Sequence, residues 1–237
     1  MRDRYLIDRD YIRIKNLNMI SYGGNQKWCT GSVMKKCGCG VIAMADVSIY
    51  LAEQNPMLMT EDIRYISKPV GLYNKNDYME YVKKFYLKYV TVLLGRGLTG
   101  LGLMCSMNRY FISQGMKLRA TWKLMLSDDS MLEAIDRQLT RDIPVIISIG
   151  PNTPNIWGKK GVSLYACQDG ELTEPHKCDV KAHYVVVTGI RNIDKRPFLV
   201  ISSWGRKYLL DYGEYREYAA KTGGRLTTSM LEIRKKY

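Results

Sequence analysis

Apolar residues fill one long stretch in the first third of the chain. The stretch covers residues 40–54 with very few polar positions, and Asn55 and Pro56 follow it. This length is typical of a helix rather than a strand, and a helix without a polar face belongs in a protein interior. We therefore predict a buried helix over residues 40–54 that ends at the Asn-Pro pair.

Weaker helical patterns flank this stretch. Residues 1–36 show turn signals and are expected to be irregular, whereas residues 77–89 and 100–115 are predicted helices. A further helix is predicted to start at Ser130, where Glu133 three residues later forms a capping box. Pro144 lies beyond its end.

The second half of the chain consists mainly of short β-branched runs. Predicted strands cover residues 145–149, 162–167, 183–190, 198–202, 207–211 and 230–234, with a short helix at 214–220. Trp204 and Gly205 are expected to form a tight connection between two of these strands. Because helices come first and strands second, the pattern predicts a single α+β domain in residues 1–237. Its helical half covers about residues 30–115 and its antiparallel β half about residues 116–237, and we expect the site in the cleft between them.

The charge balance adds one alternative function. The chain carries 36 Lys and Arg against 23 Asp and Glu, a formal net charge of +13. These cations are scattered, so a generally basic surface fits better than a nucleic-acid stripe, and nucleic-acid binding stays a minor alternative. The longest stretch without charge, residues 143–158, is broken by prolines, and no membrane span is expected. No signal peptide is visible, so we expect a cytoplasmic protein with reduced thiols.

Cys39 is the strongest candidate for a chemical role. It lies between Gly38 and Gly40 at the predicted start of the buried helix, where the helix dipole favours a thiolate. The flanking glycines leave the sulfur accessible. The chain has two histidines, His176 and His183. His183 opens a predicted strand, which is a rigid support for a base, whereas His176 lies in a polar segment.

Three segments together resemble a known family. Residues 38–45, Gly-Cys-Gly-Val-Ile-Ala-Met-Ala, are similar to the nucleophile motif of the C39-type peptidases, the papain-like group that includes bacteriocin-leader peptidases. Residues 183–189 resemble the catalytic-histidine strand of that family, and residues 202–205, Ser-Ser-Trp-Gly, resemble the Asn-Ser-Trp-Gly segment of papain. The distance from Cys39 to His183 also fits the papain order.

The resemblance implies a papain-like cysteine peptidase fold and a thiol hydrolase that cleaves a peptide or isopeptide bond. Cys39 would be the nucleophile and His183 its proton carrier, as a thiolate–imidazolium pair. Gly38, Gly40 and Trp204 would line the substrate site, and Trp204 would shield the histidine from water. No cofactor or metal is implied, and the partner would be a peptide or protein substrate.

Two positions depart from the family pattern. Ser202 stands where papain has an orienting Asn, and a hydroxyl brings no charge to stabilise an imidazolium. Asp211, at the far end of the next predicted strand, is the other candidate for orienting His183. No glutamine lies directly before Cys39, so Gln26, thirteen residues upstream, is the candidate oxyanion donor, together with the Cys39 backbone N–H.

Two further alternatives stay open at this point. A weak third residue and a distant glutamine are also typical of a papain-like domain that binds peptides without cleaving them. Cys37, Cys39, His176 and Cys178 together offer four soft ligands for zinc, although the Cys-x-Cys spacing is tighter than zinc sites prefer.

Overall fold

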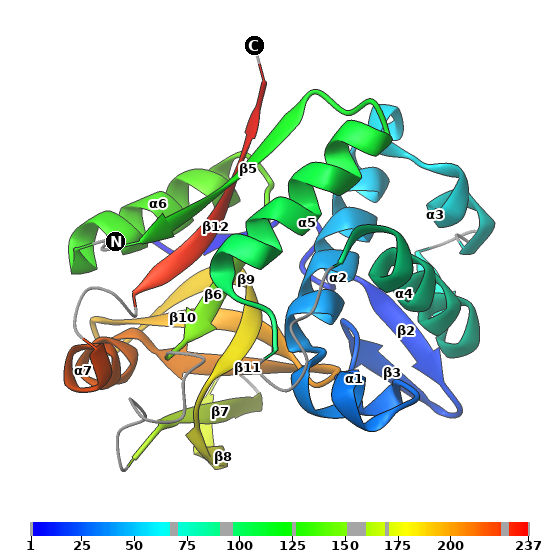
Figure 1. Cartoon of the computed structure of the whole chain (residues 1–237). Coiled ribbons are helices and arrows are strands. Elements are labelled where there is room, and N and C mark those ends of the chain that lie inside the picture. The colour runs from blue at the N-terminus through cyan, green and yellow to red at the C-terminus, as the bar shows by residue number, and fades with distance from the viewer. Residues whose placement is uncertain are drawn as a thin grey trace.

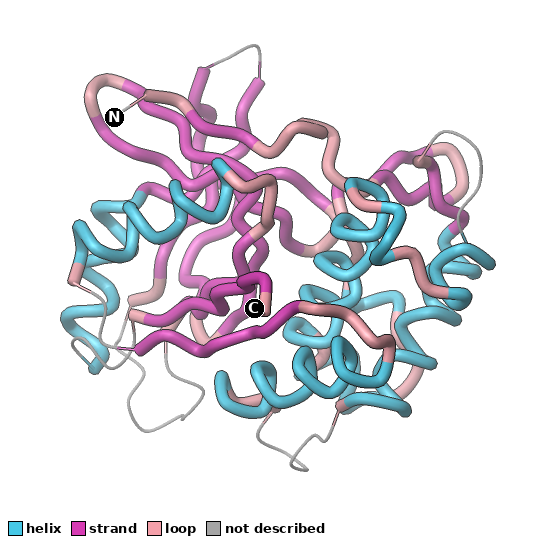
Figure 2. The backbone as a smooth tube through the Cα atoms, turned by 90° about the horizontal axis from the view of Figure 1, so that it is seen from above, coloured by secondary structure: helices cyan, strands magenta, loops and turns pink. Residues whose placement is uncertain are grey.

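The molecule combines helices with a large antiparallel sheet. The computed structural model describes residues 2–66, 71–90, 97–124, 127–150, 160–168, 171–223 and 228–236. In Figure 1 the strands of the main sheet run through the middle, with α2, α4 and α5 on one side and α6 and α7 on the other. The view from above in Figure 2 shows the same arrangement of helices around strands. The predicted combination of helices with an antiparallel sheet is therefore confirmed.

The main sheet is antiparallel throughout. Its order is β5-β12-β6-β9-β10-β11-β7-β8, and β1 pairs with β9 beside this path. The bounds are β1 Arg4–Tyr5, β5 Leu118–Leu124, β6 Val145–Ile149, β7 Val162–Gln168, β8 Glu171–Val180, β9 His183–Ile193, β10 Arg196–Ser203, β11 Arg206–Asp211 and β12 Ser229–Lys235. Because β9 and β10 lie at the centre of this order, residues at their ends are carried by buried, rigid strands.

The helix α2, Cys39–Gln54, confirms the prediction over residues 40–54. Thirteen of its residues are buried, and it packs on β9 as well as on α4 (Lys75–Tyr89) and α5 (Gly100–Ser113). An apolar run with no polar face thus forms a helix that is covered on all sides. Among the described helices, none has both the length and the apolar character needed to cross a bilayer.

The first 36 residues are more ordered than their sequence indicates, so the expectation of an irregular segment was wrong. The strands β2 (Arg13–Asn16) and β3 (Met19–Tyr22) form a small sheet with β4 (Leu72–Asn74), and η1 (Gln26–Trp28) and α1 (Ser32–Cys37) follow. Elements of three to six residues are too short to show a period in the sequence.

Other boundaries differ by smaller amounts. Helix α6 covers Asp128–Thr140, and its N-cap is Ser127, whose side chain accepts a hydrogen bond from the Ser130 backbone N–H. The predicted start at Ser130 was therefore three residues late. The strands β5 and β8 and the short helices η2 (Pro56–Leu58) and α3 (Glu61–Ile66) were not predicted, and α7 covers Tyr212–Gly223.

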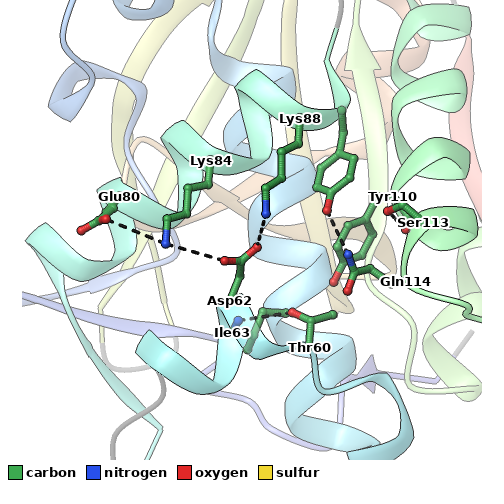
Figure 3. Close-up of polar contacts among 10 residues, drawn as sticks. Thr60, Asp62, Ile63, Glu80, Lys84, Lys88, Tyr110, Ser113 and Gln114 are labelled. Atoms are coloured by element: carbon green, nitrogen blue, oxygen red, sulfur yellow. Dashed lines mark hydrogen bonds and ion pairs between the residues drawn. The ribbon is translucent and has the colours of Figure 1, made fainter.

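The helical half is held by its interior rather than by its surface charges. Figure 3 shows Asp62 of α3 between two lysines of α4, with its carboxylate oxygens 3.7 Å from Lys84 Nζ and 2.9 Å from Lys88 Nζ. These side chains are partly exposed, and exposed pairs contribute only about 0–1 kcal/mol. Beneath them, Phe85 and Tyr110 pack with ring centroids 5.1 Å apart and are almost fully buried.

Candidate active site

Cys39 is the first residue of α2, as predicted. The preceding helix α1 ends at Cys37, and Gly38 is both its C-cap and the N-cap of α2. The Gly38 N–H donates to the Met34 carbonyl oxygen over 2.9 Å, so α1 leads almost directly into α2. The Cys39 side chain is half-buried at this junction.

His183 is the first residue of β9 and is held on three sides. It pairs with Ile149 of β6 across the sheet and is only 7% exposed. Its Nε2 lies 2.8 Å from Ser203 Oγ. The Trp204 ring stacks on the imidazole, with centroids 4.3 Å apart and an interplanar angle of 12°. The position of Trp204 over the histidine was predicted, and the structure shows it.

Cys39 and His183 line the same small cavity, which has a volume of about 20 Å³. A space of this size holds about one water molecule. One face of α2 forms a wall of the cavity, because Cys39, Ile42, Ala43 and Asp46 recur at helical spacing. Cys39 and His183 are far apart in the sequence, and the fold brings them to one cavity.

Burial shifts both groups toward their neutral forms. It raises the pKa of the Cys39 thiol, an effect that hydrogen bonds from the backbone N–H groups of Tyr184 and Gly40 offset only in part. Burial also lowers the pKa of His183 to about 3. The thiolate–imidazolium pair expected from the sequence is therefore disfavoured in the unliganded protein, because burial removes the two charges from bulk solvent.

The residue beside His183 is Ser203 rather than Ser202 or Asp211. In the pairing of β10 with β9, Ser202 lies opposite Val186. Side chains alternate along a strand, so Ser203 shares a face of the sheet with His183, whereas Ser202 lies on the opposite face, although it also lines the cavity. Ser202 Oγ instead donates to the Tyr22 carbonyl oxygen over 2.9 Å.

Asp211 is engaged at the far end of β11. Its carboxylate accepts a hydrogen bond from Arg196 Nη1 over 3.1 Å and from the Gly213 N–H over 2.8 Å. These contacts tie the end of β11 to the start of α7, and Asp211 is absent from the lining of the cavity among the described residues. The contacts of Asp211 therefore stabilise the end of β11, and Asp211 is not placed beside His183.

Gln26 reaches the cavity, but its donors are already used. It lies in η1 and is 9% exposed. Its Nε2 donates to the Lys35 carbonyl oxygen over 3.0 Å and to the Lys36 carbonyl oxygen over 3.3 Å. The side chain thereby satisfies the last carbonyl groups of α1, which a short helix leaves without partners.

Asp46 is a site residue that the sequence analysis missed. Its carboxylate is buried in the cavity wall and accepts hydrogen bonds from Tyr78 Oη over 2.6 Å and from the Gly24 N–H over 2.9 Å. Burial raises its pKa to about 7. The sequence did contain a signal, since Asp46 is an acidic residue in the middle of an otherwise apolar helix.

The glycines beside the site allow close packing. A Cβ atom on Gly40 would lie 3.2 Å from Tyr184 Cδ2, so the absence of a side chain lets α2 approach β9. Trp204 and Gly205 form the two-residue turn from β10 to β11, with φ values of 48° and 74°. Positive φ at both positions is the geometry of a tight hairpin, and it presents the Trp204 ring to His183.

The described residues do not form a ligand cluster for zinc. Within the described parts of the chain, no three His, Cys, Asp or Glu side chains converge in a way that would hold a metal ion. His176 instead lies beside Arg206 and Tyr208, in a different cavity from Cys39.

Comparisons with known proteins give distant structural neighbours. No family model matches the sequence. No curated protein matches it either. Among solved structures, digestive procathepsin L 3 of Tenebrio molitor larval midgut is similar at 14% identity and a TM-score of 0.36, covering 89% of this chain. A structure from work on the mite allergens Blo t 1 and Der p 1 is similar at 12% identity and a TM-score of 0.34, also covering 89%. The match spans 65% and 66% of those two chains, respectively.

Proposed function

We propose that the chain is a papain-like cysteine peptidase of the C39-like type, with Cys39 as nucleophile and His183 as the group that carries the proton. One observation carries the proposal: the first residue of α2 and the first residue of β9 line one cavity, under the ring of Trp204. A thiol and an imidazole on two rigid elements are the minimum that thiol acyl transfer needs.

The burial of both groups sets the order of events. The thiol and the imidazole are neutral before substrate binds, so His183 accepts the Cys39 proton as the sulfur attacks the peptide carbonyl. The proton then passes to the leaving amine, and the acyl group stays on Cys39 until water hydrolyses the thioester. His183 Nε2 faces Ser203, which leaves Nδ1 for this exchange.

Ser203 is the positioning residue in this mechanism. For Nδ1 to act as a base, Nε2 must carry the hydrogen and Ser203 Oγ must accept it. A hydroxyl accepts or donates equally well, so it selects this tautomer less firmly than a carboxylate. Stacking of Trp204 fixes the plane of the imidazole in place of a stronger polar partner.

The candidate oxyanion donors lie at the start of α2 and in η1. The Cys39 backbone N–H is next to the developing charge, and Gln26 lines the same cavity. For Gln26 to contribute, its amide has to leave the carbonyl groups of Lys35 and Lys36 when substrate binds.

The hydrogen bonds of Gln26 to α1 favour a second candidate function. In a papain-like domain that binds peptides without cleaving them, Gln26 would remain a cap of α1, and the neutral Cys39 and His183 would have no role in chemistry. The two candidates share one fold and differ in whether a thioester forms.

Cleavage of a diverse peptide library, with products identified by mass, separates the candidates. We expect the wild-type chain to cleave and Cys39→Ala to lose at least about 10³-fold in rate, because the nucleophile is absent. Cys37→Ala is the matched control, two residues away and also half-buried, and should stay within about twofold of wild type. Equal absence of cleavage by wild type and Cys39→Ala would leave the peptide-binding function as the better account.

A further inference from the structure

A second, larger cavity lies next to the candidate site and shares Trp204 with it. Its volume is about 430 Å³, and its other lining residues are Asn25, Lys27, His176, Lys177, Arg206 and Tyr208. This volume is within the range of ordinary ligand sites, about 300–1,000 Å³. The cavity therefore has room for side chains of a molecule bound in the candidate site.

Three separate segments build this cavity. Lys27 comes from η1, His176 and Lys177 come from β8, and Arg206 begins β11 directly after the Trp204 turn. Asn25 Nδ2 donates to the Trp204 carbonyl oxygen over 3.0 Å, which joins the η1 segment to the hairpin. The basic side chains are thus brought together by the fold from distant parts of the sequence.

The cavity carries positive charge without a compensating acid. Lys27, Lys177 and Arg206 are exposed, and in the described part of the chain none of them pairs with a carboxylate. Among the described residues that line the cavity, none is Asp or Glu. An anionic group entering here would meet three cations and none of those carboxylates.

Arg206 is held in a fixed position. Its Nη1 lies 2.9 Å from His176 Nε2, and since arginine only donates, the imidazole nitrogen accepts. The His176 ring in turn lies against Tyr208, with centroids 5.7 Å apart. A guanidinium held on one edge keeps its other N–H groups for a carboxylate, the group its planar fork matches best.

We propose that this basic cavity binds an acidic side chain of the peptide on the C-terminal side of the cleaved bond. The proposal rests on the proposed function, because His183 gives its proton to the leaving amine and so faces that side of the substrate. Trp204 stacks on His183 and also lines the basic cavity. Residues that follow the cleaved bond therefore pass Trp204 and reach Lys27, Lys177 and Arg206.

Binding to an inactive variant tests this site separately from cleavage. The probes are two fluorescein-labelled octapeptides that differ only in Glu or Gln at the positions after the central bond, titrated by anisotropy into Cys39→Ala. We expect the Glu peptide to bind at least about tenfold more tightly and to weaken as salt rises. The preference should disappear when Lys27, Lys177 and Arg206 are changed to Gln.

The net charge of +13 requires a matched control. Changing Lys117, Lys235 and Lys236 to Gln removes the same charge beside β5 and β12, at the opposite edge of the main sheet from β8. This variant should keep the preference for Glu. Equal binding of the two peptides, or equal loss of the preference in both triple variants, would overturn the proposal.

Two further outcomes complete the test. If an eight-residue oligothymidylate binds more tightly than the Glu peptide and loses affinity in the same cavity variant, the cavity is a nucleic-acid site and the proposal is overturned. If wild type cleaves neither peptide while Cys39→Ala still prefers Glu through the three cations, the acidic-peptide site is supported and the peptidase function fails.

Discussion

The two cavities that meet at Trp204 treat charge in opposite ways. The cavity around Cys39 and His183 is small, and burial of its ionisable groups pushes them toward neutral forms. The cavity around Arg206 is larger, and its basic side chains are exposed. Formal charge is therefore kept away from Cys39 and His183 and is found on the other side of the Trp204 ring.

The largest expected effect is on how the free energy of unfolding depends on pH, and it comes from the cavity around Cys39 and His183. In the folded chain His183 is neutral because burial lowers its pKa to about 3, whereas an unfolded histidine protonates near pH 6.5. Its contribution to stability is therefore present above pH 6.5 and is lost as the pH falls toward 3.

Replacing His183 with Gln removes that dependence. Between pH 6.5 and 4, the free energy of unfolding of wild type relative to His183→Gln should fall with decreasing pH, by up to about 1.4 kcal/mol per pH unit. Urea unfolding at several pH values measures it. A constant difference in stability between wild type and His183→Gln across this pH range would contradict the prediction.

Asp46 should give the opposite slope in the same cavity. Burial raises its pKa to about 7, whereas an unfolded aspartate has a pKa near 3.9. Its contribution to stability is therefore present below about pH 4 and is lost as the pH rises through about 7.

In wild type the slopes of His183 and Asp46 oppose each other between about pH 4 and 6.5. Asp46→Asn should expose the His183 slope, so its stability falls more steeply than that of wild type as the pH is lowered. Asn retains an acceptor for the Gly24 N–H and a donor for Tyr78 Oη, so the packing is kept. If wild type and Asp46→Asn have the same pH profile, the carboxylate is not held neutral.

A smaller effect separates the two neighbouring serines. Ser203→Ala removes the hydroxyl beside His183 Nε2 and should lower kcat/KM by up to about tenfold, the equivalent of one neutral hydrogen bond. Ser202→Ala removes the bond to the Tyr22 carbonyl and should cost about 1 kcal/mol of stability with little change in kcat/KM. A larger kinetic loss for Ser202→Ala would contradict the placement of Ser203, rather than Ser202, beside His183.

The smallest expected effect is on the free energy of unfolding when Arg206 is changed. Arg206→Gln should change the free energy of unfolding by no more than about 0.5 kcal/mol, because the side chain is exposed. Thermal unfolding measures this directly. A large destabilisation would mean that the cations of this cavity support the fold rather than a ligand.

Buried elements were predicted from the sequence better than exposed ones. Residues 40–54 and 145–149 are mainly apolar, and the structure gives α2 and β6 at those positions. The strand β8 was missed because it is mostly exposed and its residues, Glu-Leu-Thr-Glu-Pro-His-Lys-Cys-Asp-Val, show no apolar face. A strand at the edge of a sheet is fixed by its partner rather than by its own pattern.

The site was predictable to the level of elements but not of contacts. The starts of α2 and β9 placed Cys39 and His183, while the choice of Ser203 over Ser202 required the pairing of β10 with β9. Once the pairing is known, strand alternation favours Ser203, since a shift of one residue turns a side chain to the other face. The bonds of Gln26 to α1 were beyond prediction, because residues 32–37 gave no helical signal.

The most direct test of the account is covalent labelling by a peptide vinyl sulfone, with the modified residue mapped by mass spectrometry. A small alkylating agent is unsuitable, because Cys105 and Cys178 are exposed and Cys39 is not. The account predicts one label per chain, on Cys39, formed much more slowly in His183→Gln and at the wild-type rate in Cys37→Ala. Labelling of Cys105 or Cys178 instead, or labelling of Cys39 at an unchanged rate in His183→Gln, would contradict it.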